Sequence, residues 1–97
     1  MKSLVEIKKI LQNQQPYLKE NFNVESIGIF GSYVHDRQKL GSDLDVLVEF
    51  AAPIGLLKFI ALENYLSEVV GIKVDLVMKD TLKPRIEKYI LEEVVSI

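Results

Sequence analysis

Apolar residues recur along the first part of the chain at the spacing of a helix. Ser3 followed by Glu6 has the pattern of a capping box, in which two side chains satisfy backbone N–H groups at a helix start. We expect this helix to falter before Pro16, because a proline disfavours helical conformation in the residue that precedes it. A further turn or two over residues 17–20 then leads to Asn23, which ends the segment. One face of the helix carries the apolar residues Leu4, Ile7, Ile10 and Leu11.

Two strand-like segments, residues 24–30 and 43–50, come next. In the second one, apolar and polar positions alternate, which is typical of a half-buried strand. Its apolar face carries Leu44, Val46, Val48 and Phe50, and its other face carries Asp43, Asp45, Leu47 and Glu49. Gly31 and Ser32 interrupt the chain after the first strand. The polar residues 33–41 that follow predict a helical turn and then an exposed loop.

The rest of the chain predicts a helix over residues 55–70, a strand over 72–78 and a final helix over 83–95. Gly71 is the residue expected to end the first of these helices, since glycine adopts the left-handed conformation found there. The element order is therefore helix, strand, strand, helix, strand, helix. It predicts one domain of the α/β (α+β) class over residues 1–97, with a small mixed sheet of at least three strands packed against helices.

The 55–70 helix is apolar around more of its circumference than a single sheet-facing stripe requires. Three interpretations stay open for this surplus: a docking surface for a partner protein, ordinary core, or the seam of a homodimer. The choice between them depends on which of these side chains the fold leaves exposed.

Composition narrows the class of protein. The net charge of −2 argues against a general nucleic-acid binder, which usually carries a basic surface. The chain has no cysteine, which excludes disulfides and thiolate metal sites. No apolar run reaches the roughly 18 residues that a membrane span needs, and the first residues lack the uninterrupted apolar core of a signal peptide. We therefore expect a cytoplasmic protein without membrane contact or direct nucleic-acid binding.

Carboxylates on the predicted strands point to a metal site. Asp43 and Asp45 project from one face, and two carboxylates about 5 Å apart repel by roughly 3 kcal/mol at an effective dielectric of about 20. A hard divalent cation, Mg²⁺ or Mn²⁺, offsets this repulsion, whereas zinc is disfavoured by the lack of cysteines and the single histidine. Asp75, inside the apolar 72–78 strand, joins the pair if the two strands are neighbours. Three carboxylates suit a two-metal site for phosphoryl or nucleotidyl transfer. Alternatively, the pair is ordinary turn chemistry and Asp75 an exposed residue of an edge strand.

The Gly-Ser turn supplies a second kind of chemistry. Successive N–H groups at a tight turn that leads into a helix bind anions, and Gly31 lets the backbone approach a phosphate closely. Ser32 adds a hydroxyl donor, and Arg37 and Lys39 in the following loop extend far enough to reach phosphate or substrate. A Gly-Ser turn alone means little, and His35 alone is most simply a surface residue. The signal is the combination of turn, ten-residue spacer, Asp-x-Asp and a third aspartate on a later strand.

These residues resemble the signature of the nucleotidyltransferase superfamily that includes DNA polymerase β and kanamycin nucleotidyltransferase. The chain is similar in length to the minimal nucleotidyltransferase (MNT) branch, which consists of the catalytic domain alone. The resemblance rests on Gly31-Ser32, ten residues and Asp43-x-Asp45. It extends over the leading helix, residues 42–50, residues 74–77 and the closing run 82–86.

The resemblance implies a role for each site residue. Gly31 and Ser32 bind the nucleotide triphosphate; Asp43 and Asp45 bind metal; Asp75 binds metal or activates the acceptor hydroxyl. Arg37, in the loop that follows the turn, is our own candidate for a further nucleotide-binding residue. It further implies ATP as substrate, two Mg²⁺ ions with Mn²⁺ as a substitute, and a role as antitoxin. Its partner is then a HEPN-domain ribonuclease toxin, silenced by transfer of AMP to a tyrosine.

One departure from the family pattern lies in the turn. Where many MNT proteins have Arg and Gly, this chain has His35 and Asp36, so the cation that contacts phosphate is altered. This motivates an alternative of another class, a binding module that neutralises its partner without catalysis. A third possibility, transfer to a small molecule or an RNA end, is disfavoured by the lack of a substrate domain and by the near-neutral charge.

Overall fold

The computed structural model describes residues 2–35, 37, 39 and 41–97. Its four strands form one mixed sheet in the order β3-β2-β1-β4, in which β1 runs antiparallel to β2 and β4, and β2 runs parallel to β3. Along the chain the elements are α1 (Leu4–Phe22), β1 (Val24–Phe30), β2 (Leu44–Phe50), α2 (Leu56–Val70), β3 (Val74–Met78), α3 (Pro84–Glu93) and β4 (Val95–Ser96). A short 3-10 turn, η1 (Gly31–Tyr33), follows β1, and a second, η2 (Lys79–Thr81), follows β3. The predicted α/β class and mixed sheet are confirmed.

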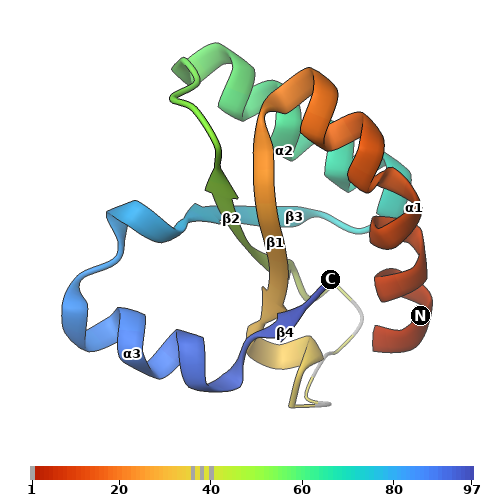
Figure 1. Ribbon diagram of the computed structural model, residues 1–97. Helices are drawn as coiled ribbons and strands as arrows, with labels where there is room; N and C mark the ends of the chain where they lie inside the picture. The colour runs from red at the N-terminus through yellow and green to blue at the C-terminus, as the bar shows by residue number, and fades with distance from the viewer. Residues whose placement is uncertain (1, 36, 38, 40) are drawn as a thin grey trace.

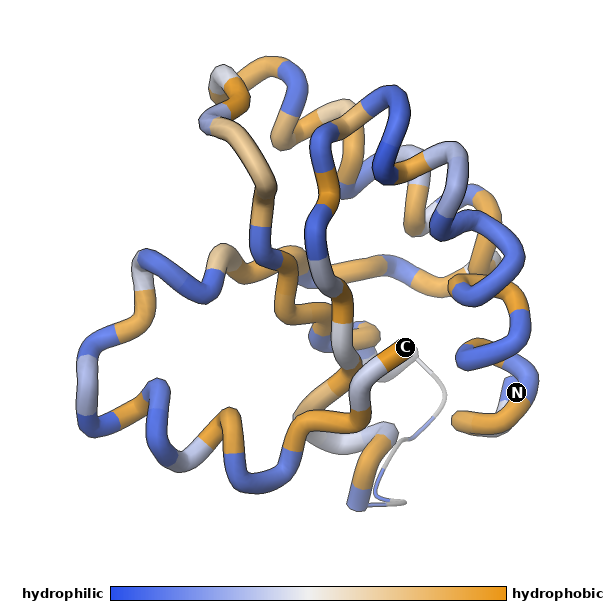
Figure 2. Tube along the Cα trace, in the orientation of Figure 1, coloured by the Kyte–Doolittle hydropathy of each residue, from blue (hydrophilic) through white to orange (hydrophobic). Residues whose placement is uncertain are grey.

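The two faces of the sheet have different surroundings. Helices α1 and α2 lie side by side across one face, while α3 lies apart from them, connected to β3 at one end and to β4 at the other (Figure 1). The core between the sheet and the two covering helices contains the completely buried residues Ile7, Leu11, Leu18, Ile29, Leu44, Val46, Leu62, Leu66 and Val70. Apolar colour accordingly follows the strands, whereas apolar and polar positions alternate along α3 (Figure 2). The opposite face of the sheet is left available for a site.

Helix α1 does not falter at Pro16, contrary to the sequence-based expectation. It is continuous over 19 residues and ends at Asn23, which caps it in the left-handed conformation at φ 55°. Leu18 and Phe22, beyond the proline, are buried in the same core as Ile7 and Leu11, and this burial outweighs the lost backbone hydrogen bond. Pro16 itself is exposed, so the carbonyl that it leaves without a helical partner is not sealed in the core.

The end of the last helix was also predicted incorrectly. Helix α3 ends at Glu93 rather than at Val95, and the chain then turns into the two-residue strand β4. Gly28 of β1 explains the change, because a Cβ atom there would lie 2.6 Å from the Cγ2 atom of Val94. The missing side chain lets Val94 pack directly over the sheet, and the residues that follow pair with the free edge of β1.

The start of α1 provides a direct test of the capping box. The Ser3 hydroxyl accepts a hydrogen bond from the Glu6 N–H (3.3 Å), and the Glu6 carboxylate accepts one from the Ser3 N–H (3.5 Å). We expect Ser3→Ala to lower the free energy of unfolding by about 1 kcal/mol, measured by urea denaturation. Ser3→Asp, which keeps a capping acceptor, should stay within a few tenths of a kcal/mol of the original protein. An equal loss in both variants would contradict this assignment.

Candidate active site

The parallel pairing of β2 with β3 brings together two of the predicted site residues. Asp45 and Asp75 are direct register partners, so their side chains project from the same face at neighbouring positions. Asp43 lies two residues before Asp45, just ahead of β2, and is exposed. β3 is an edge strand and Asp75 is exposed, as one alternative predicted, yet the register still places it beside Asp45. The face that carries them is the one opposite α1 and α2.

Gly31 lies against the Asp45 carboxylate. A Cβ atom on Gly31 would be 2.1 Å from Oδ2 of Asp45 and 3.3 Å from its Cβ atom, and Gly31 has a φ of +81°. Both the close approach and the left-handed conformation require glycine at this position. Strand β1 runs beside β2 with Phe30 opposite Asp45, so the turn that follows β1 comes directly to the carboxylate. The Gly31 turn and the Asp45 carboxylate of β2 therefore lie at one place.

The electrostatic surroundings of Asp45 are unfavourable to its charge. Burial, followed by the nearby negative charges of Asp75, Asp43 and Glu93, raises the pKa of the Asp45 carboxyl above its ordinary value of 3.8. Three other carboxylates thus act on the charge of Asp45, and among the described residues no cationic side chain lowers its pKa in return. A site of this kind gains from a bound cation.

The residues fit a hard divalent ion by the chemistry of their donors. Asp43, Asp45 and Asp75 offer only carboxylate oxygens, the ligands that Mg²⁺ and Mn²⁺ prefer. Within residues 2–35, 37, 39 and 41–97, no three side chains of the ligating types converge closely enough to define a metal site in their present orientations.

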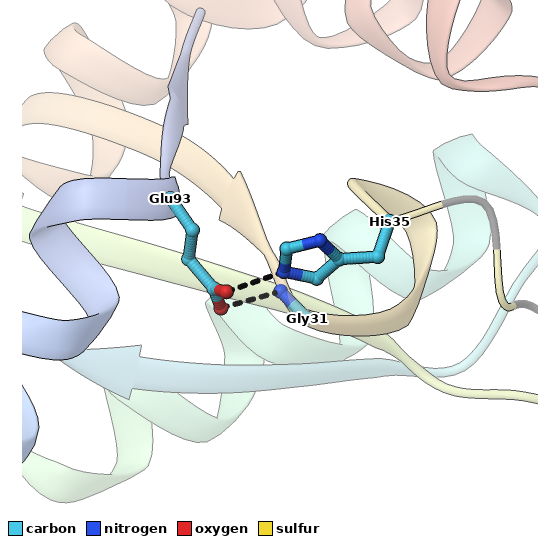
Figure 3. Close-up of polar contacts among 3 residues, drawn as sticks. All are labelled: Gly31, His35 and Glu93. Atoms are coloured by element: carbon cyan, nitrogen blue, oxygen red, sulfur yellow. Dashed lines mark hydrogen bonds and ion pairs between the residues drawn. The ribbon is translucent and has the colours of Figure 1, made fainter.

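A fourth carboxylate, Glu93 at the end of α3, joins the site and was not foreseen from the sequence. Its Oε1 atom accepts a hydrogen bond from the Gly31 N–H at 3.3 Å, and its Oε2 atom lies 2.5 Å from Nε2 of His35 (Figure 3). The His35 hydrogen bond first, and then the Gly31 N–H and the charges of His35 and Arg37, lower the pKa of Glu93 despite some burial. No local sequence signal identified Glu93, because one glutamate in an amphipathic helix looks like surface charge.

The other predicted binding residues are placed as follows. The Ser32 carbonyl accepts a hydrogen bond from the Arg37 N–H at 2.8 Å, so the chain curls back on itself after the turn. The Arg37 side chain is exposed, and its positive charge helps to lower the pKa of Glu93. Lys39 instead lines a separate pocket of about 600 Å³ with Lys2, Ser42 and Lys73. Asp36 lies outside the described residues.

The docking surface suggested for residues 55–70 can now be located more narrowly. Leu56 and Leu57, at the start of α2, are 72% and 83% exposed, and Ile60 is 42% exposed. The rest of the apolar surplus is mainly core, since Leu62, Leu66 and Val70 are buried. None of the helices that the structure describes is long and apolar enough to cross a membrane.

Comparisons with known proteins show the family and the fold of this chain. Residues 6–97 match the nucleotidyltransferase domain family. A protein adenylyltransferase, MntA, of Thermococcus cleftensis is 50% identical over 97 residues, which is all of this chain and 98% of the relative. A solved structure described provisionally as a minimal nucleotidyltransferase superposes with a TM-score of 0.76 at 27% identity, over 96% of this chain and 90% of that one. The fold also matches a complex of a tri-AMPylated Shewanella oneidensis HEPN toxin with its MNT antitoxin (TM-score 0.60, 21% identity, 94% of this chain and 65% of that one).

Proposed function

The chain belongs to the nucleotidyltransferase domain family, and from this premise we propose that it transfers AMP from ATP to a hydroxyl group of a partner protein. One observation carries the proposal: the Gly31 turn lies directly against Asp45, whose register partner is Asp75. An anion-binding backbone and a set of carboxylates are thereby placed at one point, as transfer between a nucleotide and a hydroxyl requires.

In the proposed reaction, the acceptor oxygen attacks the α-phosphorus of ATP in line with the departing group. A new P–O bond forms to the acceptor, the α–β phosphoanhydride bond breaks, and pyrophosphate leaves. The Gly31 N–H and the Ser32 hydroxyl bind phosphate oxygens and orient the chain of phosphates. Asp75, exposed on an edge strand, is accessible to an incoming hydroxyl and accepts its proton on a carboxylate oxygen. Mg²⁺ held by Asp43 and Asp45 would neutralise the charge that develops on the phosphates.

A protein acceptor is supported by the names of relatives that this chain matches over its whole length, among them the protein adenylyltransferase MntA. The kinship to MntA and to an MNT antitoxin fold supports a HEPN-type ribonuclease toxin as that partner, silenced by AMPylation. The exposed residues Leu56 and Leu57 at the start of α2 offer an apolar surface on which such a partner would dock.

A second candidate function is neutralisation of the partner by binding alone. It is favoured by the Gly31 turn of this chain, where the Glu93 carboxylate already uses the N–H expected to bind phosphate. It is also favoured by His35, which replaces the arginine of the family pattern that this turn resembles. The two candidates differ in whether the partner is changed covalently.

The chemistry can be tested by label transfer. The protein is incubated with Mg²⁺, its partner, and ATP labelled either at the α-phosphate or at the γ-phosphate. We expect label on the partner from α-labelled ATP only, because AMP transfer releases the γ-phosphate within pyrophosphate. The double variant Asp43→Asn/Asp45→Asn should transfer at least 100-fold less label.

Asp80→Asn is the matched control, since Asp80 is an exposed aspartate in η2, outside the site. It should transfer label at the rate of the original protein. Transfer of γ-label would indicate a kinase instead. Absence of any label on the partner, with unchanged binding to it, would leave the binding module as the function.

A further inference from the structure

Glu93 occupies the position at which the proposed function needs a phosphate oxygen. Its carboxylate accepts the Gly31 N–H hydrogen bond through one oxygen and contacts His35 through the other, so both of its oxygens are engaged at the turn (Figure 3). A carboxylate and a phosphate are both anions that use the same kind of backbone donor. The single Gly31 N–H cannot donate a full hydrogen bond to both the carboxylate and a phosphate. Two anions held at the same N–H group would also repel each other.

The contact joins segments that are far apart in the sequence. Gly31 and His35 follow β1, whereas Glu93 is the last residue of α3, 62 positions after Gly31. Only 18% of the Glu93 side chain is accessible, although no residue of α3 is fully buried. The hydrogen bonds of this carboxylate therefore attach the end of α3 to the Gly31 turn.

The backbone at this point is held in place independently of Glu93. Val94 packs over Gly28, Val95 and Ser96 pair with β1, and the Ile97 N–H donates to the Ile27 carbonyl at 3.0 Å. None of these contacts involves the Glu93 side chain, so that side chain can rotate away from Gly31 while β4 stays paired.

We infer that Glu93 is a built-in competitor of the nucleotide, whose carboxylate holds the Gly31 anion site in the free protein and is displaced by a phosphate group of ATP. This rests on the proposed function, in that Gly31 is the phosphate-binding turn. A ligand must therefore bind the Gly31 turn more strongly than the Glu93 carboxylate does. A triphosphate accompanied by a divalent ion meets this condition more readily than a singly charged anion. Displacement also releases His35 from Glu93, which leaves its imidazole free to turn toward the bound phosphate.

The inference is tested by the affinity for a non-hydrolysable ATP analogue with Mg²⁺, measured by calorimetry. Glu93→Ala should bind the analogue about tenfold more tightly than the original protein, because one charge-assisted hydrogen bond no longer has to be broken. Glu93→Gln, which keeps the size of the side chain and loses its charge, should fall between the two. Glu92→Ala is the matched control, because Glu92 is the exposed neighbour with the same charge; its affinity should equal that of the original protein.

A second readout uses the single histidine of the chain, whose ring signals in NMR spectra of tag-free protein report on the Glu93 contact. The analogue should shift these signals in the original protein toward the position that they already have in Glu93→Ala. Equal affinity of the original protein and Glu93→Ala, or weaker binding by Glu93→Ala, would overturn the inference while leaving the proposed function intact. Absence of binding by every variant would instead refute the proposed function, and the inference with it.

Discussion

Replacing Gly31 with alanine is expected to reduce AMP transfer at least 100-fold. The new methyl group would stand 2.1 Å from Oδ2 of Asp45, so the carboxylate must rotate out of its place beside the turn. Because Cβ of Asp45 is itself only 3.3 Å away, rotation alone leaves the contact tight and the turn is pushed off β2 as well. Transfer of α-label to the partner measures the loss.

Gly41→Ala separates this effect from backbone strain. Gly41 also has a positive φ, +89°, but a Cβ atom there has no neighbour within 4 Å. Both substitutions should therefore cost about 1–2 kcal/mol of unfolding free energy from the left-handed conformation, whereas only Gly31→Ala should lose the activity. Equal activity losses in the two variants would mean that strain in the loop, and not the approach to Asp45, limits the reaction.

Asp45→Asn is expected to abolish transfer and at the same time to stabilise the fold. The carboxylate is half-buried among other carboxylates, and its raised pKa means that its charge opposes folding at neutral pH. Removing the charge should raise the Tm by a few degrees at pH 7, while activity falls by at least 100-fold because a proposed metal ligand is lost. Asp43→Asn is the comparison: Asp43 is exposed, so its loss should reduce activity with little change in Tm.

The sign of the pH dependence follows from the same shift. A carboxyl whose pKa is raised in the folded state favours folding below its unfolded pKa, near 3.8, and this contribution is lost as the pH rises through the raised value. The difference in Tm between Asp45→Asn and the original protein should therefore be small near pH 3 and grow toward pH 7. Thermal unfolding at a series of pH values measures it, and addition of Mg²⁺ at pH 7 should narrow the difference by stabilising only the original protein. A constant difference across this range would contradict the assignment.

Local patterns predicted the parts of this site that lie within single elements. The alternation of β2 placed Asp43 and Asp45 on one face, and the glycine-serine pair marked the turn, because each depends on neighbours in the sequence. The pairing of Asp45 with Asp75 was an expectation that depended on strand order. Strand order arises from packing over the whole sheet, so only the structure could confirm it.

The features that sequence patterns missed all depend on contacts between distant segments. Pro16 normally interrupts a helix, but burial of Leu18 and Phe22 keeps α1 continuous. The valines after Glu93 continued a helical pattern, and only the space above Gly28 turns them into an edge strand. Glu93 itself reaches the site because that change of direction carries the end of α3 to the turn.

Covalent modification and simple binding of the partner differ in one direct respect. A modified partner stays inactive after this protein has been removed, whereas a partner that is only bound recovers its activity. The ribonuclease activity of the proposed HEPN-type partner is measured after incubation with this protein, ATP and Mg²⁺, followed by complete removal of the protein. We predict that the partner stays inactive after treatment with the original protein and recovers fully after treatment with Asp43→Asn/Asp45→Asn. Recovery of activity in both cases, or persistent silencing by the double variant, would contradict it.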